Sequence, residues 1–373
     1  MMDVQSGRHV FGMRRTSSQI HSFSQHRYHG AYKELPPPNG TYPYRLDLAT
    51  VLGQETVDKI AAAGKLVFHT VGDTGNWSYG AEAQDSVAEH MERQTEQGAE
   101  ADRPAFFYHL GDVVYLYGEE KYYADQFYEP YIQYLPPIFA IAGNHDGDTF
   151  VGGNPSLQAF MENLCAAQPA HTWMAGHSNR TTMTQPNVYW TLKTPLATII
   201  GLYSNVTGEL DKGNRDQEDW LTAELTAAKE EKCVLVAVHH PPYSLDDTHG
   251  GHKPIEDSLD RAFAASGKTP TAVLTGHVHN YQRFMRAVNG REVPYLVAGA
   301  GGYAGYTRLH QLKREAAPPA GVTLAAHNTE LPGFLTITVT KNALRGEYFV
   351  VPPPPGHLTG PARSVDQFTV SLK

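Results

Sequence analysis

Five short apolar stretches in this chain are each followed directly by a cluster of glycine, aspartate, asparagine or histidine. The stretches cover residues 65–71, 105–110, 137–142, 234–238 and 271–275. They are nearly continuous apolar runs, which are typical of strands buried on both faces of a sheet. Such strands need a helix or a second sheet against each face, so the pattern favours an α/β fold.

The polar clusters stand at the carboxyl ends of the expected strands. In chain order they are Gly72-Asp73-Thr74-Gly75, Gly111-Asp112-Val113-Val114-Tyr115, Gly143-Asn144-His145-Asp146, His239 and Gly276-His277-Val278-His279. Open α/β sheets bind ligands outside the carboxyl ends of their strands, and glycine lets the backbone turn sharply there. One Gly-Asp pair or one His-x-His is by itself typical of a turn or a solvated loop. Five clusters in this order predict a single crevice on which they converge.

The rest of the chain predicts further strands and helices. Helices are expected over 48–64, 85–98 and 216–229, and strands over 188–204 (a pair broken at Pro195), 293–298, 334–340 and 344–351. The last two read as a hairpin that turns at Lys341-Asn342. Because these strand pairs exceed what one sheet needs, we predict an α/β fold with two stacked mixed β-sheets flanked by helices.

The same pattern predicts one large domain. Residues 1–45 read as an irregular extension, 46–351 as the domain, and 352–373 as a tail whose end could add an edge strand. The four prolines over 352–355 exclude regular structure at the start of the tail.

The residue types in the clusters suit a pair of metal ions. Aspartate, tyrosine and histidine together suit a hard, oxidisable cation such as iron, whereas asparagine and neutral histidine suit a borderline divalent ion. One carboxylate can bridge two ions that lie ~3.5–4 Å apart.

The motif set GDxG, GDxxY, GNH[D/E], VxxH and GHxH resembles the purple acid phosphatases, within the calcineurin-like metallophosphoesterases, over about residues 65–283. The wider superfamily has Asp-x-His in its first motif. Here Gly75 stands in place of that histidine, and Tyr115 can supply the missing ligand. These two departures together single out the purple subgroup. The resemblance implies the family's fold, an α/β/β/α four-layer sandwich.

The resemblance also implies a ligand set and a reaction. The expected metal ligands are Asp73, Tyr115 and His279 for Fe³⁺, Asp112 as the bridge, and Asn144, His239 and His277 for Fe²⁺, Zn²⁺ or Mn²⁺. The implied activity is hydrolysis of phosphate monoesters by a hydroxide held between the metals. With a ferric ion, a divalent ion and that hydroxide, the site carries a charge of about +1, which attracts a phosphate dianion.

Three further residues are candidates for the catalytic machinery. His145 follows a ligand and would serve as general acid or phosphate donor, with Asp146 orienting its ring. His249 lies ten residues beyond His239, where purple acid phosphatases often place a substrate-contacting histidine. The alternative to a catalytic role is a structural role for His145. For His249 the alternative is a place on a solvated loop without a role.

Several other side chains have two interpretations. His252 could reach the substrate from the same loop, although a solvated loop fits it better. His240 faces away from the site if its strand continues. The side chains that read as core, pocket wall or turn are His69, His109, Trp77, Tyr117, Tyr243, Cys165, Cys233 and the stretch Gly299-Ala300-Gly301-Gly302-Tyr303.

Charge and composition restrict the partners. The 30 Lys and Arg against 39 Asp and Glu give a net charge of −9, which argues against nucleic acid or an acidic membrane as partner. No run approaches the ~20 apolar residues of a membrane span. We expect a small phosphorylated substrate and inorganic phosphate as product, with the oligomeric state left open.

The N-terminal sequence and the cysteines bear on location. Residues 1–45 contain no apolar core of signal-peptide length, and two cysteines cannot form a disulfide framework. A cytoplasmic location is favoured, with import into an organelle or non-classical export as alternatives.

The main alternatives keep the fold and change the function. A phosphodiesterase acting on nucleotides would use the same metals with fewer positive donors and a wider cleft, so the loop around His249 discriminates it. A non-catalytic scaffold would not need the seven ligands together with His145.

Overall fold

The apolar runs form the middle strands of two β-sheets in the computed structural model, which describes residues 30–75 and 81–372. The six-stranded sheet has the order β14-β13-β12-β2-β3-β4. Its strands are β2 (Lys65–Val71), β3 (Phe107–His109), β4 (Ile138–Ala140), β12 (Gly333–Thr340), β13 (Ala343–Val350) and β14 (Arg363–Ser371). The pairs β2·β3 and β3·β4 are parallel and the others are antiparallel.

The eight-stranded sheet has the order β1-β5-β6-β7-β8-β10-β9-β11. Its strands are β1 (Arg45–Asp47), β5 (Trp190–Lys193), β6 (Thr198–Leu202), β7 (Val234–Val238), β8 (Ala272–Thr275), β9 (Tyr281–Val288), β10 (Arg291–Ala298) and β11 (Val322–Asn328). The run β6·β7·β8·β10 is parallel, and antiparallel pairs flank it on both sides. Both sheets are therefore mixed.

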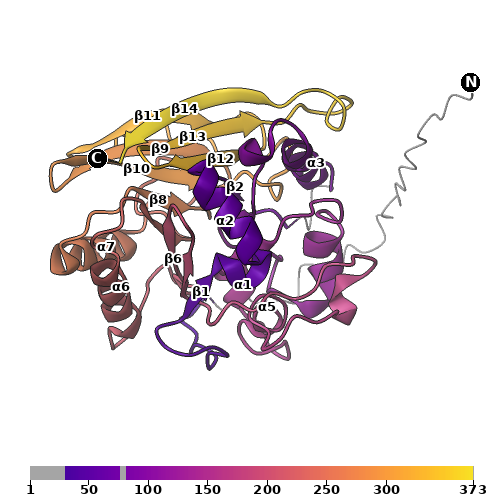
Figure 1. Cartoon of the computed structure of the whole chain (residues 1–373), viewed down its shortest axis with the longest axis horizontal. Helices are drawn as coiled ribbons and strands as arrows, with labels where there is room; N and C mark the ends of the chain where they lie inside the picture. Colours follow the sequence, from indigo (N-terminus) through magenta and orange to yellow (C-terminus); the bar gives the residue numbers. More distant parts are fainter. Residues whose placement is uncertain (1–29, 76–80, 373) are drawn as a thin grey trace, which may run out of the picture.

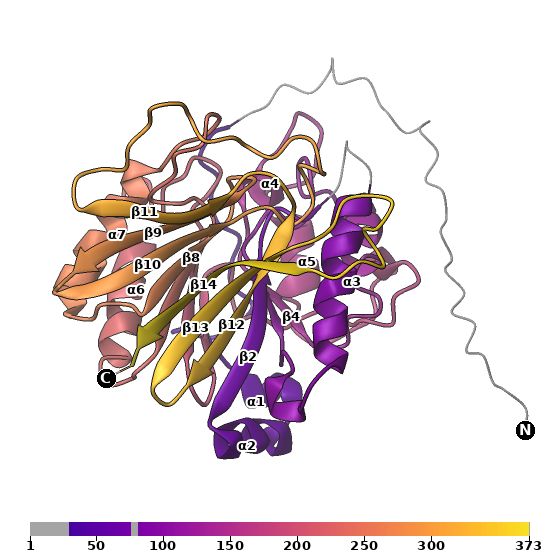
Figure 2. The same cartoon turned by 90° about the horizontal axis from the view of Figure 1, so that it is seen from above.

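The helices are α1 (Leu48–Leu52), α2 (Gln54–Ala63), α3 (Glu82–Glu96), α4 (Asn144–Gly147), α5 (Gln158–Leu164), α6 (Asp216–Ala227) and α7 (Lys253–Ser266). Helices α3, α5, α6 and α7 cover the outer faces of the sheets, whereas Leu48 of α1 and Val57 of α2 belong to the apolar cluster between them. Figures 1 and 2 show α6 and α7 on one side of the paired sheets and α3 and α5 on the other. The prediction of two stacked mixed sheets flanked by helices is confirmed.

Alternate residues of the middle strands explain why both sheet faces are buried. On β2, Phe68 points between the sheets, whereas Val71 packs under α3. On β7, Leu235 points between the sheets, whereas Val236 packs under α6 and α7. Since both faces of these strands exclude water, every position favours an apolar side chain, which produces the continuous runs in the sequence.

The structure differs from the prediction in several elements. The helix expected over 48–64 is broken at Gly53, whose φ of 81° does not continue a helix. Strands β1, β9 and β11 and helices α5 and α7 were not predicted. In β9, Arg283 and Arg286 interrupt the apolar pattern because that strand is only partly buried toward its end.

The two ends of the chain also differ in what the structure describes. Of the N-terminal extension, residues 1–29 lie outside the described part, as does Trp77. In the tail, β14 pairs with β13 at the edge of the six-stranded sheet. Within residues 30–75 and 81–372, no helix combines the length and the apolar character that crossing a bilayer requires.

Candidate metal centre

The polar clusters of both sheets meet at one edge of the sandwich. Asp73 follows β2, Asp112 and Tyr115 follow β3, and Asn144 follows β4. From the other sheet, His239 follows β7, and the pair His277 and His279 follows β8. Parallel neighbours place their carboxyl ends at the same edge. All seven predicted ligands are at least nine-tenths buried there.

Three of these side chains form one group of donor atoms. The Tyr115 hydroxyl lies 3.1 Å from Asp73 Oδ1 and 3.5 Å from His279 Nε2. His279 Nε2 and Asp73 Oδ1 are also 3.5 Å apart. Metal–ligand bonds of ~2.0–2.2 Å separate neighbouring donors by about 3–3.5 Å, so this spacing fits one ion.

The other four side chains form a second group. His239 Nε2 lies 3.1 Å from Asn144 Oδ1 and 3.3 Å from Asp112 Oδ2. Asp112, His239 and His277 each offer a ligand atom within 4.8 Å of the other two. Asp112 therefore lies in the group that includes Asn144. Burial together with the charge of this carboxylate raises the pKa of Tyr115.

The atoms around His239 Nε2 in the second group attract a positive charge. The Nδ1 of His239 lies 2.8 Å from the carbonyl of Leu110. A carbonyl only accepts, so Nδ1 carries the proton and the lone pair of Nε2 faces two oxygens. Burial lowers the pKa of His239, but the carboxylate of Asp112 outweighs it and raises that pKa to about 9. The position that attracts a proton here is the position that a metal ion would take, so the residues fit a cation.

The backbone at these ligands is strained. Asp73, Asp112 and His277 have φ values of 58°, 53° and 67°, in the left-handed region that non-glycine residues avoid. Strain of this kind costs about 1–3 kcal/mol per residue and clusters at functional sites. At Gly143, a Cβ would collide with the carboxylate of Asp112. The tight turns therefore bring the ligands closer than regular strands would.

His145 lies at the rim of the centre. Its main-chain N–H donates to Asp112 Oδ1 over 2.8 Å, and its Nδ1 lies 2.8 Å from the carbonyl of Leu116. The ring centroid is 4.4 Å from that of Tyr115. Because a carbonyl only accepts, the proton of the neutral ring sits on Nδ1, and Nε2 carries the lone pair.

Asp146 makes hydrogen bonds that hold the loops of the centre. Its carboxylate accepts hydrogen bonds from the main-chain N–H groups of Val113, Val114 and Gly143. Burial, together with the nearby charge of Asp112, raises the pKa of Asp146 to about 7. Asp146 therefore fixes the loops that carry Asp112 and Asn144, and its expected role in orienting His145, whose Nδ1 lies at the carbonyl of Leu116, stays a prediction.

The loop after His239 brings His249 to the centre. Its ring centroid lies 4.3 Å from that of His277 and 6.2 Å from that of His279. The carboxylate of Asp246 holds this loop, accepting from the main-chain N–H groups of His249 and Gly250 over 2.8 Å each. Burial lowers the pKa of His249 to about 4.

Two residues near the centre were missed from the sequence. His310 places its Nδ1 3.3 Å from Asp246 Oδ2, and its ring centroid lies 4.4 Å from that of His279. Tyr303 stacks on Tyr115, with ring centroids 3.8 Å apart and an angle of 14° between the planes. His310 lies on a long loop between β10 and β11, outside all of the motifs. The sequence predicts Gly299–Tyr303 only as a turn near the site. Nothing in that pattern indicates that Tyr303 stacks on Tyr115.

His240 and His252 lie beside His277. Strand β7 ends at Val238, so His240 does not follow the strand alternation that would have turned it away. Its ring centroid is 4.2 Å from that of His277 and 4.4 Å from that of His252.

The remaining candidates belong to the core or its margin. His69 bonds Tyr134 and Gln94, and His109 bonds Thr74 and the N–H of Gly111. Tyr243 packs against Phe284 and Tyr295 under the eight-stranded sheet, and Tyr117 packs against Phe150. Cys165 and Cys233 are buried and unbridged.

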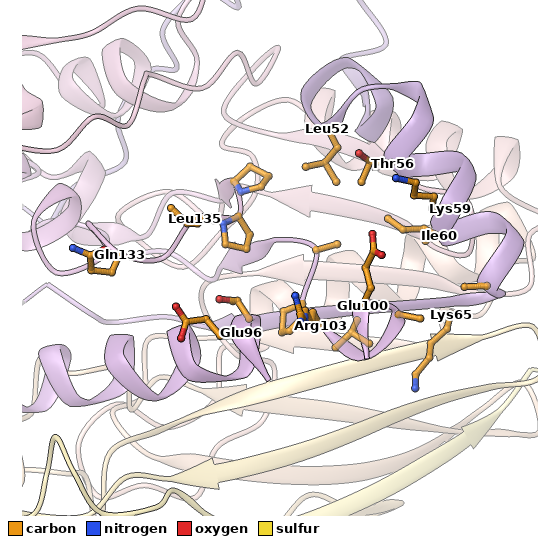
Figure 3. Close-up of a pocket in the computed structure, with 18 residues that line it drawn as sticks. Leu52, Thr56, Lys59, Ile60, Lys65, Glu96, Glu100, Arg103, Gln133 and Leu135 are labelled. Carbon is orange, nitrogen blue, oxygen red and sulfur yellow. The ribbon is translucent and has the colours of Figure 1, made fainter. Parts of the chain in front are cut away.

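A separate cavity of about 740 Å³ lies near the amino end of β2, away from the metal-ligand candidates. Figure 3 shows Leu52 and Ile60 from α1 and α2 facing Glu96, Arg103 and Leu135 across it. None of the seven predicted ligands lines it. Its lining is largely apolar and lacks the convergent donors of the centre, so the candidate site stays at the carboxyl edge.

Comparison with known proteins gives a family and several relatives. A family model described as Calcineurin-like phosphoesterase matches residues 66–281. Purple acid phosphatase 21 of Arabidopsis thaliana is 26% identical over 165 residues, which are 40% of this chain and 35% of that protein. The matched region thus spans about a third of this curated relative. These matches confirm the resemblance drawn from the motifs.

Two solved structures share the fold. GAP50, "the anchor in the inner membrane complex of Plasmodium", has a TM-score of 0.57 at 14% identity, over 83% of this chain and 89% of its own. The purple acid phosphatase PPD1 from yellow lupin (Lupinus luteus) has a TM-score of 0.55 at 15% identity, over 82% of this chain and 54% of its own. At such low identity the likeness is one of fold.

Proposed function

The chain belongs to the calcineurin-like phosphoesterase family, and we propose that it is a dinuclear metal-dependent hydrolase of phosphate monoesters. The observation that carries this proposal is the convergence of the seven donors into two groups, one of which contains a tyrosine hydroxyl. The proposed substrate is a small phosphorylated compound, and inorganic phosphate is the product.

The proposed metal pair uses the ligands that the resemblance assigned. Asp73, Tyr115 and His279 would hold Fe³⁺, and Asn144, His239 and His277 would hold Fe²⁺, Zn²⁺ or Mn²⁺, with Asp112 between the two. Bound ions would lower the pKa of water and neutralise charge on the phosphate. Burial raises the pKa of Tyr115, so only a highly charged neighbouring cation would convert its hydroxyl to a phenolate.

His145 is the proposed proton donor to the leaving group. With Nδ1 held by the carbonyl of Leu116, the second nitrogen, Nε2, takes up and releases the catalytic proton. Its main-chain N–H donates to Asp112, which ties the position of the ring to the proposed bridging ligand.

His249 is the proposed contact for a phosphate oxygen. Its ring lies against His277 and His310, and Asp246 fixes its loop, so the ring is held in place before a substrate binds. A histidine fixed over the centre narrows the space for the second ester group of a diester. This geometry favours monoesters over the alternative activity on diesters.

The non-catalytic alternative has less support. A scaffold, such as the anchor GAP50 is described to be, needs only the fold. This chain also buries seven donors at one edge of the sandwich, and three of them, Asp73, Asp112 and His277, lie on strained backbone, which costs free energy that folding alone does not require.

The test compares two chromogenic esters on the purified, metal-loaded protein. We expect kcat/KM for p-nitrophenyl phosphate to exceed that for bis-p-nitrophenyl phosphate by about 100-fold or more, equivalent to about 3 kcal/mol. Asp112→Asn should abolish hydrolysis, whereas His327→Ala, at an exposed histidine of β11, should leave it unchanged. Preference for the diester would establish the alternative enzyme, and inactivity with two ions bound would contradict both.

A further inference from the structure

Three histidine rings form a cluster beside the seven-donor centre, here called the histidine trio: His240, His252 and His277. Their ring centroids lie 4.2 Å (His240 to His277), 4.4 Å (His240 to His252) and 5.2 Å (His252 to His277) apart. Each ring offers a nitrogen within 4.8 Å of a nitrogen of the other two. The trio and the second donor group share only His277.

The loop that follows β6 fixes His240. Its Nδ1 lies 2.7 Å from the hydroxyl oxygen of Ser204, and the same oxygen accepts the main-chain N–H of His240 over 3.3 Å. When Nδ1–H donates to Ser204, the lone pair of Nε2 is left for a ligand. Metal-binding histidines are usually held in this way by a hydrogen bond from their other nitrogen.

The same loop presses on His252. The main-chain N–H of His252 donates to the carbonyl of Pro241 over 2.8 Å. Gly208 lies so close to the ring that a Cβ there would collide with Nδ1. The other nitrogen, Nε2, is buried and has no hydrogen-bond partner among the described residues. A buried polar atom without a partner destabilises the fold, and a bound ligand would recover that free energy.

We propose that His240, His252 and His277 bind a third cation, a zinc ion, beside the metal pair. Three imidazole nitrogens with an open fourth position are a donor set that zinc takes in catalytic sites. The trio contains no carboxylate, which disfavours magnesium, calcium and manganese. Zinc–nitrogen bonds of ~2.0–2.1 Å bring the nitrogens closer together than 4.8 Å, so the rings close on the ion as it binds.

His277 contributes to both centres in this arrangement, so the inference rests on its place in the proposed pair. An imidazole has two nitrogens, and each can contact a different ion. The ring proton leaves to solvent when the second contact forms, so uptake of the third ion releases one proton from His277. The open position of the zinc is available to an oxygen of the substrate or to water.

The first experiment counts metal ions. The full-length chain, already loaded with its metal pair, is dialysed against rising concentrations of zinc chloride, and total metal per chain is measured by mass spectrometry. Wild type should saturate at about three ions and His252→Ala at about two. His327→Ala, which removes an exposed histidine, should behave like wild type. Two ions in wild type, or three in His252→Ala, would overturn the proposal.

Two glycine variants distinguish the effect of the His252 ring on zinc binding from a general effect on folding. Gly208 and Gly213 have φ values of 73° and 81°, so alanine is strained at both, but a Cβ at Gly213 has no neighbour within 4 Å. Gly208→Ala should lose the third ion, and Gly213→Ala should keep it. Equal metal content in these two variants would contradict a zinc site that depends on the ring of His252.

Two readouts distinguish this inference from the proposed function. Diffraction at the zinc absorption edge should show a peak among the three rings, and Asp112→Asn, which disables the pair, should still bind one zinc ion. A chain that binds zinc among these rings but hydrolyses no ester supports the third site and contradicts the phosphatase. A chain that hydrolyses the ester but binds only two ions supports the phosphatase and contradicts the third site.

Discussion

At the scale of single residues, Tyr115 distinguishes this centre from one built only of carboxylates and imidazoles. Its hydroxyl lies within 3.5 Å of both Asp73 and His279, and Tyr303 covers its ring. A phenolate bound to Fe³⁺ absorbs visible light, whereas the phenol of the metal-free protein does not.

We predict that Tyr115→Phe loses the visible absorption band and binds iron more weakly. The substitution removes one donor and leaves the ring that packs under Tyr303. The check is an absorption spectrum with metal analysis on the purified variant, with Tyr117→Phe as the matched control. A band that survives in Tyr115→Phe would mean that another residue binds the iron.

His145→Ala tests the proposed proton donor. Loss of a general acid lowers kcat by about 10²–10⁴-fold, and the proposed metal ligands are untouched, so two ions should remain. An ester with a highly acidic leaving group should be much less affected, and an equal loss on both esters would argue for a structural role.

The sequence predicts the seven ligands but not the residues that support them. Each ligand follows a buried strand, so its position is encoded in a short motif. His310 and Tyr303 reach the centre from loops whose paths depend on tertiary packing, and no local pattern marks them. The contacts of Asp146 were missed for the same reason: adjacency to His145 says nothing of the three N–H groups from which its carboxylate accepts hydrogen bonds.

At the scale of elements, the accuracy of prediction follows burial. Strands such as β2 and β7 are apolar on both faces and were recognised. In β14, exposed and half-buried residues alternate, so that strand could only be suggested from the sequence. Helix α7 begins at Lys253 directly after a glycine-containing loop, with Pro254 at its start, which is where prolines are accepted.

Strand β2 carries a histidine that makes stability depend on pH. Burial lowers the pKa of His69 from 6.5 to about 4, despite its hydrogen bond to Gln94. Between these values the unfolded chain binds a proton that the folded chain does not, so stability falls as the pH falls. We expect this residue to contribute a loss of up to about 3 kcal/mol between pH 7 and pH 4.

The measurement is urea unfolding of wild type and His69→Gln at both pH values. The variant does not titrate at this position, so its stability should fall less steeply and approach that of wild type in acid. Equal slopes for the two proteins would show that His69 keeps its usual pKa in the fold.

At the scale of the whole molecule, an ion pair joins the two sheets. Asp366 of β14 accepts two hydrogen bonds from Arg283 of β9, at 2.7 Å and 2.9 Å, and one from the hydroxyl of Tyr281 at 2.7 Å. The side chains of Arg283 and Asp366 are only 13% and 10% exposed. Truncating the carboxylate leaves a nearly buried cation unpaired.

We predict that Asp366→Ala lowers the free energy of unfolding by about 3 kcal/mol. Metal content should be unchanged, because the partners of Asp366 in this contact, Arg283 and Tyr281, are not among the proposed ligands. Glu347→Ala, on the neighbouring strand β13, should stay within about 0.5 kcal/mol of wild type. Equal effects of the two substitutions would mean that the ion pair is not what joins the sheets.

The proposed ligands also span the two sheets. Asp73, Asp112, Tyr115 and Asn144 come from the six-stranded sheet, and His239, His277 and His279 come from the eight-stranded one. Because ions bind the folded chain and not the dispersed ligands of the unfolded one, removing them with a chelator should lower the melting temperature by several degrees. Asp73→Ala treated in the same way is the control and should shift little. Unchanged melting after complete metal removal would contradict ligation across the sheets.

If the proposed ions also connect the two sheets, the lifetime of the chain would depend on how much metal is available. If the proposed ions bind, a shortage of metal would leave a less stable chain rather than an equally stable apoprotein. Without the ions, no metal ligation would connect the two sheets at the carboxyl edge. The chain would then unfold more often, and proteases would cleave it sooner. Scarcity of the metal would then lower the amount of this protein as well as its proposed activity, through the placement of seven side chains.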